Sequence, residues 1–242
     1  MKGVLLGICR EAQLIDISHS VAAYGITEAA FTLSQAWQFF PAGTVHLIVV
    51  DPGVGSARRP IVAEAAGHRF VAPDNGVLTM IYDSVPVHEV REITASHLFH
   101  QPVSHTFHGR DIFSPVAAHL AGGLAPSEAG SVITDYVRLG FSRAAQTGDK
   151  TCSGAILKID RFGNLITNLD SALGQRLRTE KFGLRIGWHV VSRFAETYAE
   201  MPAGEIFVIG GSSGLLEISV NQASAAQLTA ARPGEPLELH LG

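Results

Sequence analysis

The sequence contains little cysteine, no excess of basic charge and no long uninterrupted apolar run. Its two cysteines, Cys9 and Cys152, lie far apart and in no Cys-x-x-Cys or Cys/His spacing, so the pattern indicates neither a disulfide framework nor a zinc site. We therefore expect a reducing, cytoplasmic environment. The formal net charge of −4 supplies no positive field for a polyanion, which argues against nucleic acid as a partner.

The apolar stretch at the N-terminus is also too short to indicate a membrane protein. In MKGVLLGIC the apolar residues end at Arg10 and Glu11, before the length that a signal sequence or a membrane span requires. Apolar material is otherwise plentiful, because 46% of the 242 residues are hydrophobic and 17% are charged. This composition predicts a globular protein with one large or two modest domains that binds a small molecule.

From Met1 to about Gly140, short apolar runs alternate with longer amphipathic segments. Strands and helices that alternate in this way predict a Rossmann-like α/β domain with a mostly parallel sheet. The expected strands are Val4–Ile8, Gln13–Ile17, Val45–Val50, Arg69–Ala72 and Val87–Ile93, and the expected helices are Ile26–Phe40 and Ile112–Leu120.

The segment from Gly140 to Gly154 is the most linker-like in the chain, and it suggests a first domain at residues 1–145 and a second at residues 152–242. Beyond it, short apolar runs separated by turns predict a small, β-barrel-like second domain or a sandwich. The expected strands are Ala155–Ile159, Leu184–Ile186, Ile206–Ile209, Leu215–Val220 and Leu237–Leu239, with one helix at Ala223–Ala230.

One glycine-containing segment, VVDPGVGSARRP at residues 49–60, admits two readings from its residues alone. A nucleoside-triphosphate loop would end in a Lys-Ser or Lys-Thr pair, and a dinucleotide-binding loop would have a third small residue where Arg58 stands. The segment has neither feature, and Asp51 would repel a phosphate, so a phosphate-binding loop is disfavoured. The alternative is a tight turn with two surface arginines.

Three further stretches place polar residues at turns. FVAPDNGVLT at residues 70–79 is more often a turn than a site. IDRFGNLITN at residues 159–168 also fits a turn, but a turn would not require Phe162 and Asn164 together. The third, at residues 105–115, puts His108, Arg110 and Asp111 within four residues at the start of a helix. Asp111 could cap that helix and pair with Arg110, but such a cluster is often functional because its members are costly to bury unpaired.

The sequence resembles, in five motifs taken in order, the S-adenosyl-L-methionine (SAM) hydrolases, also called SAM hydroxide adenosyltransferases. The motifs are VVDPGVGSARR, PDNGVLT, TFHGRDIFSPVAAHLAGG, IDRFGNLITN and GSSGLLEISVNQASAA. DISHSVAAYGITEAAF also fits a family segment that usually reads D-I-T-H. The family is related to the SAM-dependent fluorinases and chlorinases. The resemblance implies attack of water or hydroxide at the 5′ carbon of SAM, giving adenosine and L-methionine, with SAM as the substrate and with no cofactor and no metal.

The resemblance also implies which residues act on the water. The family's Asp, Arg and His match Asp51, Arg58 and His108. Asp51 would accept the hydrogen bond or proton of the water, Arg58 would hold the developing hydroxide, and His108 would orient it or relay the proton. Whether Asp51 or His108 finally takes the proton stays open. Phe107 and Gly109, on either side of the histidine, are further candidates for substrate contact.

Substrate contacts in the second domain follow from the same resemblance. Asp160 matches the residue that contacts the methionine ammonium group, Phe162 and Asn164 match the adenine contacts, and Ser212 matches a residue beside the methionine carboxylate. Relatives with an Arg after that serine differ from this chain, which has Ser213. Halide-using relatives have non-ionising groups in place of the acid and the histidine, since a carboxylate beside the nucleophile would repel chloride or fluoride. Because the acid is present here, hydrolysis is favoured over halogenation.

Assembly and completeness are also expectations from the resemblance. The family forms homotrimers with active sites at subunit interfaces, so we expect the same here. The family usually begins about twenty residues earlier, with a strand ending in a T-D-F-G-type segment that contacts the ribose, which implies a late start codon or a truncated chain and an incomplete ribose site. A non-catalytic adenosine- or SAM-binding protein is therefore the main alternative. An NAD-dependent oxidoreductase is disfavoured because its glycine fingerprint is missing.

Overall fold

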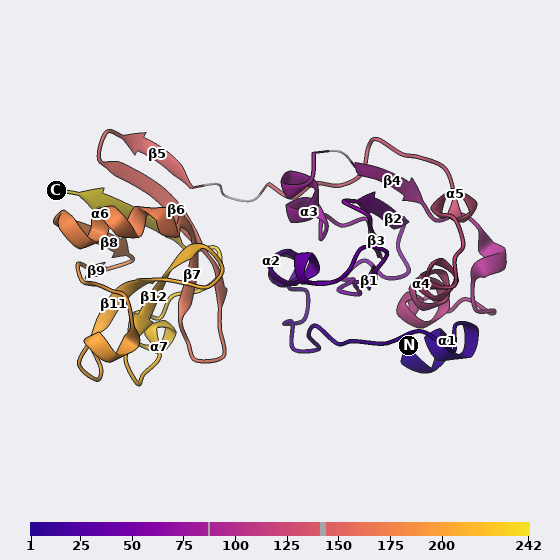
Figure 1. The fold of residues 1–242 in the computed structure, drawn as a ribbon, viewed down its shortest axis with the longest axis horizontal. Coiled ribbons are helices and arrows are strands. Elements are labelled where there is room, and N and C mark those ends of the chain that lie inside the picture. The colour runs from indigo at the N-terminus through magenta and orange to yellow at the C-terminus, as the bar shows by residue number, and fades with distance from the viewer. Residues whose placement is uncertain (87, 141–143) are drawn as a thin grey trace. The chain divides into compact units, whose positions relative to one another are not determined.

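The structure, a computed structural model, describes residues 1–86, 88–140 and 144–242 (Figure 1). The chain divides into two compact units, unit 1 at Met1–Leu139 and unit 2 at Gly140–Gly242. None of the helices in these described ranges is long and apolar enough to cross a membrane. Both units mix helices with β-sheet, and the chain therefore has a mixed α/β fold.

Unit 1 combines short helices with a 4-stranded sheet of order β1-β3-β2-β4. The strands are β1 (Val45–Leu47), β2 (Pro60–Ala65), β3 (His68–Pro73) and β4 (His88–Glu92). The α-helices are α1 (Lys2–Ile8), α2 (Ile26–Ala36), α3 (Thr79–Ser84), α4 (Ser114–Ala121) and α5 (Pro126–Ala129). Short 3₁₀ turns follow at Trp37–Phe39 and Ser96–Leu98, and a π-helical turn at Gly109–Phe113 leads directly into α4.

The sheet of unit 1 is mixed. β1 pairs in parallel with β3, whereas β2 pairs antiparallel with both β3 and β4. The prediction of a mostly parallel sheet is therefore wrong for the pairings that the structure describes. For β2 and β3 the cause is the two-residue turn Ala66-Gly67, whose φ angles of 49° and 78° match the type of hairpin turn that folds a strand back onto its neighbour.

The N-terminal segment also differs from expectation. The apolar run at Val4–Ile8 was expected to be a strand, but it belongs to α1, which packs against α4 (Figure 1). Leu5 of α1 contacts the core of unit 1. A run this short carries too little periodicity to separate helix from strand, so tertiary contact decides its structure. Gln13–Ile17 forms no strand either.

Four other predicted elements of unit 1 are confirmed. They are α2 with the 3₁₀ turn that follows it, β3, β4 and α4. β1 is shorter than the predicted strand, and Val87, the first residue predicted for β4, lies outside the described residues. Phe113 and Val116 pack against Val62 and Val71 in the core, so α4 covers the sheet.

Unit 2 contains a 9-stranded sheet whose main path is β10-β11-β12-β7-β6-β13-β8-β9, with β5 paired to β6 off this path. The strands are β5 (Ala145–Gly148), β6 (Thr151–Ile159), β7 (Leu165–Asp170), β8 (Phe182–Ile186), β9 (His189–Val191), β10 (Phe194–Ala195), β11 (Ile206–Gly210), β12 (Leu215–Val220) and β13 (Pro236–Leu241). The helices are α6 (Gly174–Thr179) and α7 (Ala225–Thr229), with 3₁₀ turns at Ser171–Leu173 and Tyr198–Glu200.

This sheet is curled into a half-barrel. The register shifts between Ile156 and Lys158 in β6 and between Leu215 and Glu217 in β12, and such β-bulges bend and twist a strand. β9 consequently contacts β11 although five strands separate them along the sheet path. The five strands and the helix predicted for this region are confirmed. Closure into a barrel stays a prediction.

The predicted linker at Gly140–Gly154 is wrong in part. Residues 145–148 form β5, which pairs with β6, while residues 141–143 lie outside the described residues. All four residues of β5 are exposed. An exposed strand of this kind lacks the apolar alternation from which strands are predicted, and its composition therefore looks like that of a loop.

Candidate active site

A tight loop between β1 and β2 carries Asp51 and Arg58. Ser56 stabilises it, since its Oγ donates to the carbonyl oxygen of Gly53 at 2.6 Å. Gly55 has a φ of +75°, and a Cβ at this position would lie 2.3 Å from the carbonyl oxygen of His105. Glycine is required here, because the loop lies directly against the backbone that leads to the π-helical turn.

Arg58 joins Asp51 and His108. Its Nε donates to Asp51 Oδ1 at 3.0 Å, and its Nη2 donates to Asp51 Oδ2. The same Nη2 lies 3.1 Å from His108 Nδ1. The guanidinium also stacks over Phe113, with Cζ 5.1 Å from the ring centroid. The three residues that the sequence resemblance singles out, 57 positions apart at the extremes, therefore meet at one point in unit 1.

The pair at the centre of this cluster is buried. The side chains of Asp51 and Arg58 are 6% and 7% exposed. Burial lowers the pKa of His108, the Arg58 charge lowers it further, and the charges of Asp51 and Asp111 oppose the shift. His108 is thus neutral near pH 7. Because a guanidinium only donates, Nδ1 of His108 accepts from Arg58, and the ring proton is on Nε2.

One donor of Arg58 is unused. Its Nη1 is buried and has no hydrogen-bond partner in the part of the chain that the structure describes. A buried N–H without a partner is costly, typically by about 1–3 kcal/mol. An oxygen atom of a ligand or water placed beside Nη1 would remove this cost.

The residues flanking His108 have different surroundings. Phe107 is 44% exposed, so its ring is available to a ligand. Gly109 is buried, and a Cβ there would lie 3.1 Å from both Met1 Sδ and Val49 Cγ1. Gly109 is therefore in close packing contact with Met1, at the start of α1, and with Val49, in the loop that follows β1.

Arg110 and Asp111 form the pair that the sequence allowed as a structural alternative. Arg110 Nε donates to Asp111 Oδ1 at 2.6 Å, and the backbone N of Ser104 donates to Oδ2 at 2.9 Å. Asp111 is fully buried. These contacts fix the segment that presents His108, and the ion pair holds the pKa of Asp111 well below its usual range.

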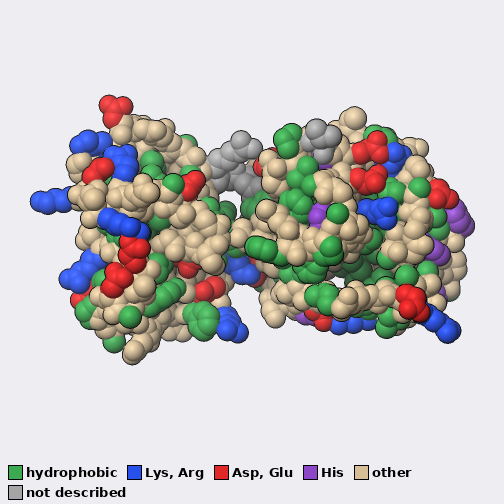
Figure 2. Space-filling model, viewed as in Figure 1, with side chains coloured by type: hydrophobic (Ala, Val, Ile, Leu, Met, Phe, Trp, Pro, Cys, Tyr) green, Lys and Arg blue, Asp and Glu red, His purple; other side chains and the backbone are tan. Residues whose placement is uncertain are grey.

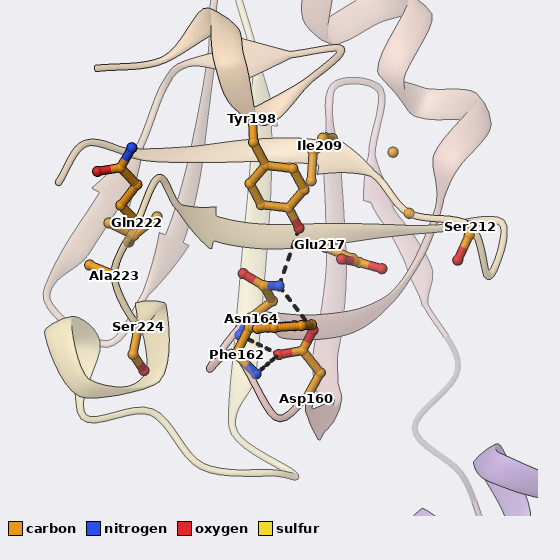
Figure 3. Close-up of a pocket in the computed structure, with 13 residues that line it drawn as sticks. Asp160, Phe162, Asn164, Tyr198, Ile209, Ser212, Glu217, Gln222, Ala223 and Ser224 are labelled. Carbon is orange, nitrogen blue, oxygen red and sulfur yellow. Dashed lines mark hydrogen bonds between the residues drawn. The ribbon is translucent and has the colours of Figure 1, made fainter. Parts of the chain in front are cut away.

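Unit 2 contains a cavity of about 780 Å³ (Figure 3). Four residues assigned from the sequence resemblance line it, namely Asp160, Phe162, Asn164 and Ser212. The other lining residues are Tyr198, Ile209, Gly210, Gly211, Glu217, Val220, Gln222, Ala223 and Ser224. Of these, Glu217 lies within the motif GSSGLLEISVNQASAA, but the resemblance assigns it no contact. Tyr198 lies outside all five motifs, so no pattern in the sequence indicated its position in the cavity.

Asp160 and Asn164 are held by a network of hydrogen bonds at one side of this cavity. Asp160 Oδ1 accepts from the backbone N of Phe162 at 2.8 Å and of Asn164 at 2.9 Å. Asn164 Nδ2 donates to Asp160 Oδ2 at 2.9 Å and to Tyr198 Oη at 3.2 Å. Both amide hydrogens of Asn164 are therefore used, and Figure 3 shows its amide oxygen pointing away from Asp160. This oxygen can accept a hydrogen bond from a ligand.

Phe162 lies at the mouth of the same network and is 64% exposed. Gly163, which follows it, has a φ of +87°, and a Cβ there would lie 2.0 Å from Ser224 Oγ. The turn therefore depends on glycine to pack against the start of α7. Arg161 lies over one face of the Phe162 ring, with Cζ 4.6 Å from the centroid, and the exposed ring is suited to stacking on a nucleobase through its other face.

Charge is distributed without a dominant sign. On the face drawn in Figure 2, acidic and basic side chains lie interspersed. Within the described ranges, no group of three or more His, Cys, Asp or Glu side chains is arranged to hold a metal ion.

Comparisons with known proteins cover almost the whole chain. The family model for the SAM hydroxide adenosyltransferase N-terminal domain matches residues 1–130, and the model for the C-terminal domain matches residues 154–238. The chain is 35% identical to an (R)-S-adenosyl-L-methionine hydrolase of Salinispora arenicola, over 99% of this chain and 91% of the relative. It is 28% identical to a fluorinase of an Actinoplanes species, over 98% and 86% of the two chains. A crystal structure of an uncharacterized conserved protein from Thermotoga maritima is similar, with a TM-score of 0.90 and 36% identity over 99% of this chain and 93% of that one.

Proposed function

The chain belongs to the SAM hydroxide adenosyltransferase family, and from that premise we propose that Asp51, Arg58 and His108 carry out its chemistry. The protein is a hydrolase that converts SAM to adenosine and L-methionine. The observation that carries the assignment of residues is the buried guanidinium of Arg58, which contacts both Asp51 and His108 and retains one unused donor.

The leaving group needs little assistance. The sulfonium of SAM carries a positive charge that is lost when the carbon–sulfur bond breaks, so the sulfur departs as a neutral thioether and no general acid is required. The demand falls on the nucleophile, because water has a pKa of about 15.7 and must be deprotonated or polarised.

The cluster in unit 1 has a group for each part of that task. The unused Nη1 of Arg58 donates to the oxygen of the water as negative charge develops, and His108, whose Nδ1 accepts from Arg58, holds the guanidinium in place. His108 cannot accept the proton at Nδ1, which is occupied by Arg58. Asp51 therefore takes the proton, using a lone pair that the Arg58 contacts leave free.

The cavity in unit 2 supplies the binding of adenosine. Phe162 stacks on the adenine ring, and Asn164 Oδ1 accepts a hydrogen bond from its exocyclic amino group. Base–aromatic stacking contributes roughly 1–3 kcal/mol. Because Asn164 presents an acceptor, a base with a carbonyl in the same place leaves two acceptors facing each other.

Hydrolysis fits the cluster better than halogenation. The buried carboxylate of Asp51 next to the nucleophile position repels chloride and fluoride but attracts the hydrogens of water. A non-catalytic adenosine-binding protein would need no buried Asp51–Arg58 pair beside a histidine, and burying such a pair carries a desolvation cost.

The direct test is incubation of the purified protein with SAM, with and without chloride, followed by chromatography. We expect adenosine and L-methionine in equal amounts and no 5′-chloro product. Binding of SAM without formation of adenosine would support the non-catalytic alternative.

We propose further that the protein is a homotrimer with active sites at subunit interfaces. This rests on the family, since the structure describes one chain. Mixing chains that carry Asp51→Asn with chains that carry Asp160→Ala tests it, because each is expected to be inactive alone. Shared sites predict partial recovery of activity in the mixture, whereas sites built within one chain predict none.

A further inference from the structure

The motif PDNGVLT has no part in the function proposed above, yet it contacts both ends of the loop between β1 and β2 that carries the Asp and Arg of the cluster. Val50 precedes this loop's acid and Arg59 follows its arginine. Asn75 Nδ2 donates to the carbonyl oxygen of Val50 at 2.9 Å. The backbone N of Asp74 donates to the carbonyl oxygen of Arg59, also at 2.9 Å. Two consecutive residues of one motif therefore hold the two ends of the loop.

The motif is itself anchored to the last residues of unit 1. Asp74 Oδ1 accepts from the backbone N of Val137 at 2.8 Å, and Thr79 Oγ1 accepts from the backbone N of Leu139 at 2.9 Å. Gly76 has a φ of +86°, and a Cβ there would lie 2.5 Å from Leu139 Cγ. Glycine thus lets this segment pass directly over the turn. These contacts make the motif a fixed support from which a side chain can position the loop.

The contact between Asn75 and Val50 sets the direction in which Asp51 points. The peptide unit that joins Val50 to Asp51 is planar, so a donor bound to its carbonyl oxygen also fixes the backbone N and Cα of Asp51. The amide of Asn75 is held in turn, because its Oδ1 accepts from the backbone N of Val77 at 3.2 Å. Asn75 thereby orients the carboxylate that accepts from Arg58 Nε at 3.0 Å.

We propose that Asn75 is a positioning residue of the reaction, which orients Asp51 toward Arg58 and the attacking water by holding the Val50–Asp51 peptide. This inference rests on the proposed function, in which Asp51 takes the proton of the water, and it adds a residue to which the resemblance assigns no role. Catalysis depends steeply on placement, since a displacement of about 1 Å can lower a rate ~100-fold. Loss of the Asn75 donor should therefore slow turnover while SAM still binds.

Two substitutions remove this donor in different ways. Asn75→Ala removes the whole amide. Asn75→Asp keeps the shape of the side chain and an oxygen that accepts from Val77, but it puts an acceptor against the carbonyl oxygen of Val50. With SAM as the substrate, we expect each substitution to lower kcat at least ~10-fold and to change KM less than about 2-fold. Thermal unfolding gives the folded fraction, so that kcat is expressed per folded molecule.

A double-mutant cycle separates positioning from general stability. Asn75→Ala should lower kcat less than about 2-fold when it is added to Asp51→Asn, because that chain has no base left to position. Thr79→Val is the matched control, since it keeps the shape of a side chain in the same motif and removes the hydrogen bond to Leu139. We expect Thr79→Val to destabilise the protein while changing kcat per folded molecule less than about 2-fold.

The inference is overturned if Asn75→Ala and Asn75→Asp keep the wild-type kcat or raise KM instead. It is also overturned if Asn75→Ala lowers kcat equally with and without Asp51→Asn, or if Thr79→Val loses as much turnover. Failure of the proposed function would look different, because the wild type would then form no adenosine from SAM, or Asp51→Asn would keep full turnover, and the inference would fall with it. Failure of the inference alone leaves the activity of the wild type and its dependence on Asp51 intact.

Discussion

Replacing Asp51 by Asn tests the proposed division of labour in the cluster of unit 1. The substitution keeps the shape of the side chain but removes its charge and turns one acceptor into a donor. Arg58 Nε and Nη2 both donate to Asp51, so at least one of these contacts becomes a clash between two donors. Asn is also unable to accept a proton from water.

The magnitude for catalysis follows from the role of a general base. Loss of such a base typically lowers turnover by ~10²–10⁴-fold, and we expect at least ~100-fold, which corresponds to about 2.7 kcal/mol of transition-state stabilisation. Because Asp51 does not contact the adenosine or methionine groups in the proposed arrangement, KM for SAM should change little.

The magnitude for stability follows from the burial of the pair. Asp51 and Arg58 are 6% and 7% exposed, and removal of one partner of a buried pair costs about 3–5 kcal/mol. Since an amide oxygen still accepts one bond, we expect the lower end, about 3 kcal/mol, or roughly 6–12 °C in the unfolding midpoint.

A matched control separates the two effects. Asp74 has a side chain that is 3% exposed and accepts from Arg59 Nε at 3.0 Å and from Nη2 at 2.7 Å. Asp74→Asn should destabilise the protein to a similar extent while lowering turnover per folded molecule less than about 5-fold. The assay is adenosine formation over a range of SAM concentrations, with the folded fraction from thermal unfolding. The reasoning is refuted if Asp51→Asn raises KM with kcat unchanged, or if both variants lose the same turnover.

Other measurements probe other parts of the structure. Burial lowers the pKa of His46, which is stacked against His68, to about 4. The unfolding free energy should therefore fall by up to about 3 kcal/mol as the pH drops from about 6.5 to about 4, because only the unfolded state binds the proton in that window. In denaturant titrations, His46→Phe should flatten this dependence of the unfolding free energy on pH. Gly163→Ala, which places a Cβ 2.0 Å from Ser224 Oγ, should weaken adenosine binding at least ~10-fold, and unchanged affinity in calorimetry would show that the turn tolerates a side chain. Inosine should bind at least ~10-fold more weakly than adenosine, because its carbonyl faces Asn164 Oδ1; equal affinities would contradict that contact. Light scattering coupled to size exclusion should give the mass of three chains, and a mass of one chain with full activity on dilution would exclude the trimer.

The sequence predicted the elements whose apolar residues follow a clear helical or strand pattern. It did not predict the elements whose structure depends on tertiary contacts. The amphipathic pattern of α2 and the apolar runs of β6, β11 and β12 were sufficient to place these elements. For α1, seven residues with two glycines are equally compatible with a strand, and its contact with α4 decides the outcome. The hairpin at Ala66-Gly67 escaped notice because Ala rarely takes a φ of +49°.

The candidate site was predictable to a different degree in each unit. The motifs that contain Asp51 and His108 could be compared with a known family, but their convergence on Arg58 depends on folding that no local pattern encodes. Glu217 was missed because alternation along β12 is compatible with either a surface or a cavity position. What distinguishes it is its place on the wall of the cavity, beside Gly211, where a Cβ would meet its carboxylate; the rest of that wall comes from segments far apart in sequence, such as Asp160 and Tyr198.

The place of β13 in the sheet affects how the protein folds while it is being synthesised on the ribosome. β13 consists of Pro236–Leu241, yet it lies between β6 and β8 and hydrogen-bonds to both. Unit 1 can fold while the rest of the chain is still being translated, but the sheet of unit 2 stays incomplete until β13 has left the exit tunnel. Until then β6 and β8 expose unpaired edges, which are open to pairing with other nascent chains. A stalled or prematurely terminated chain that ends before Pro236 should therefore aggregate rather than fray at one end.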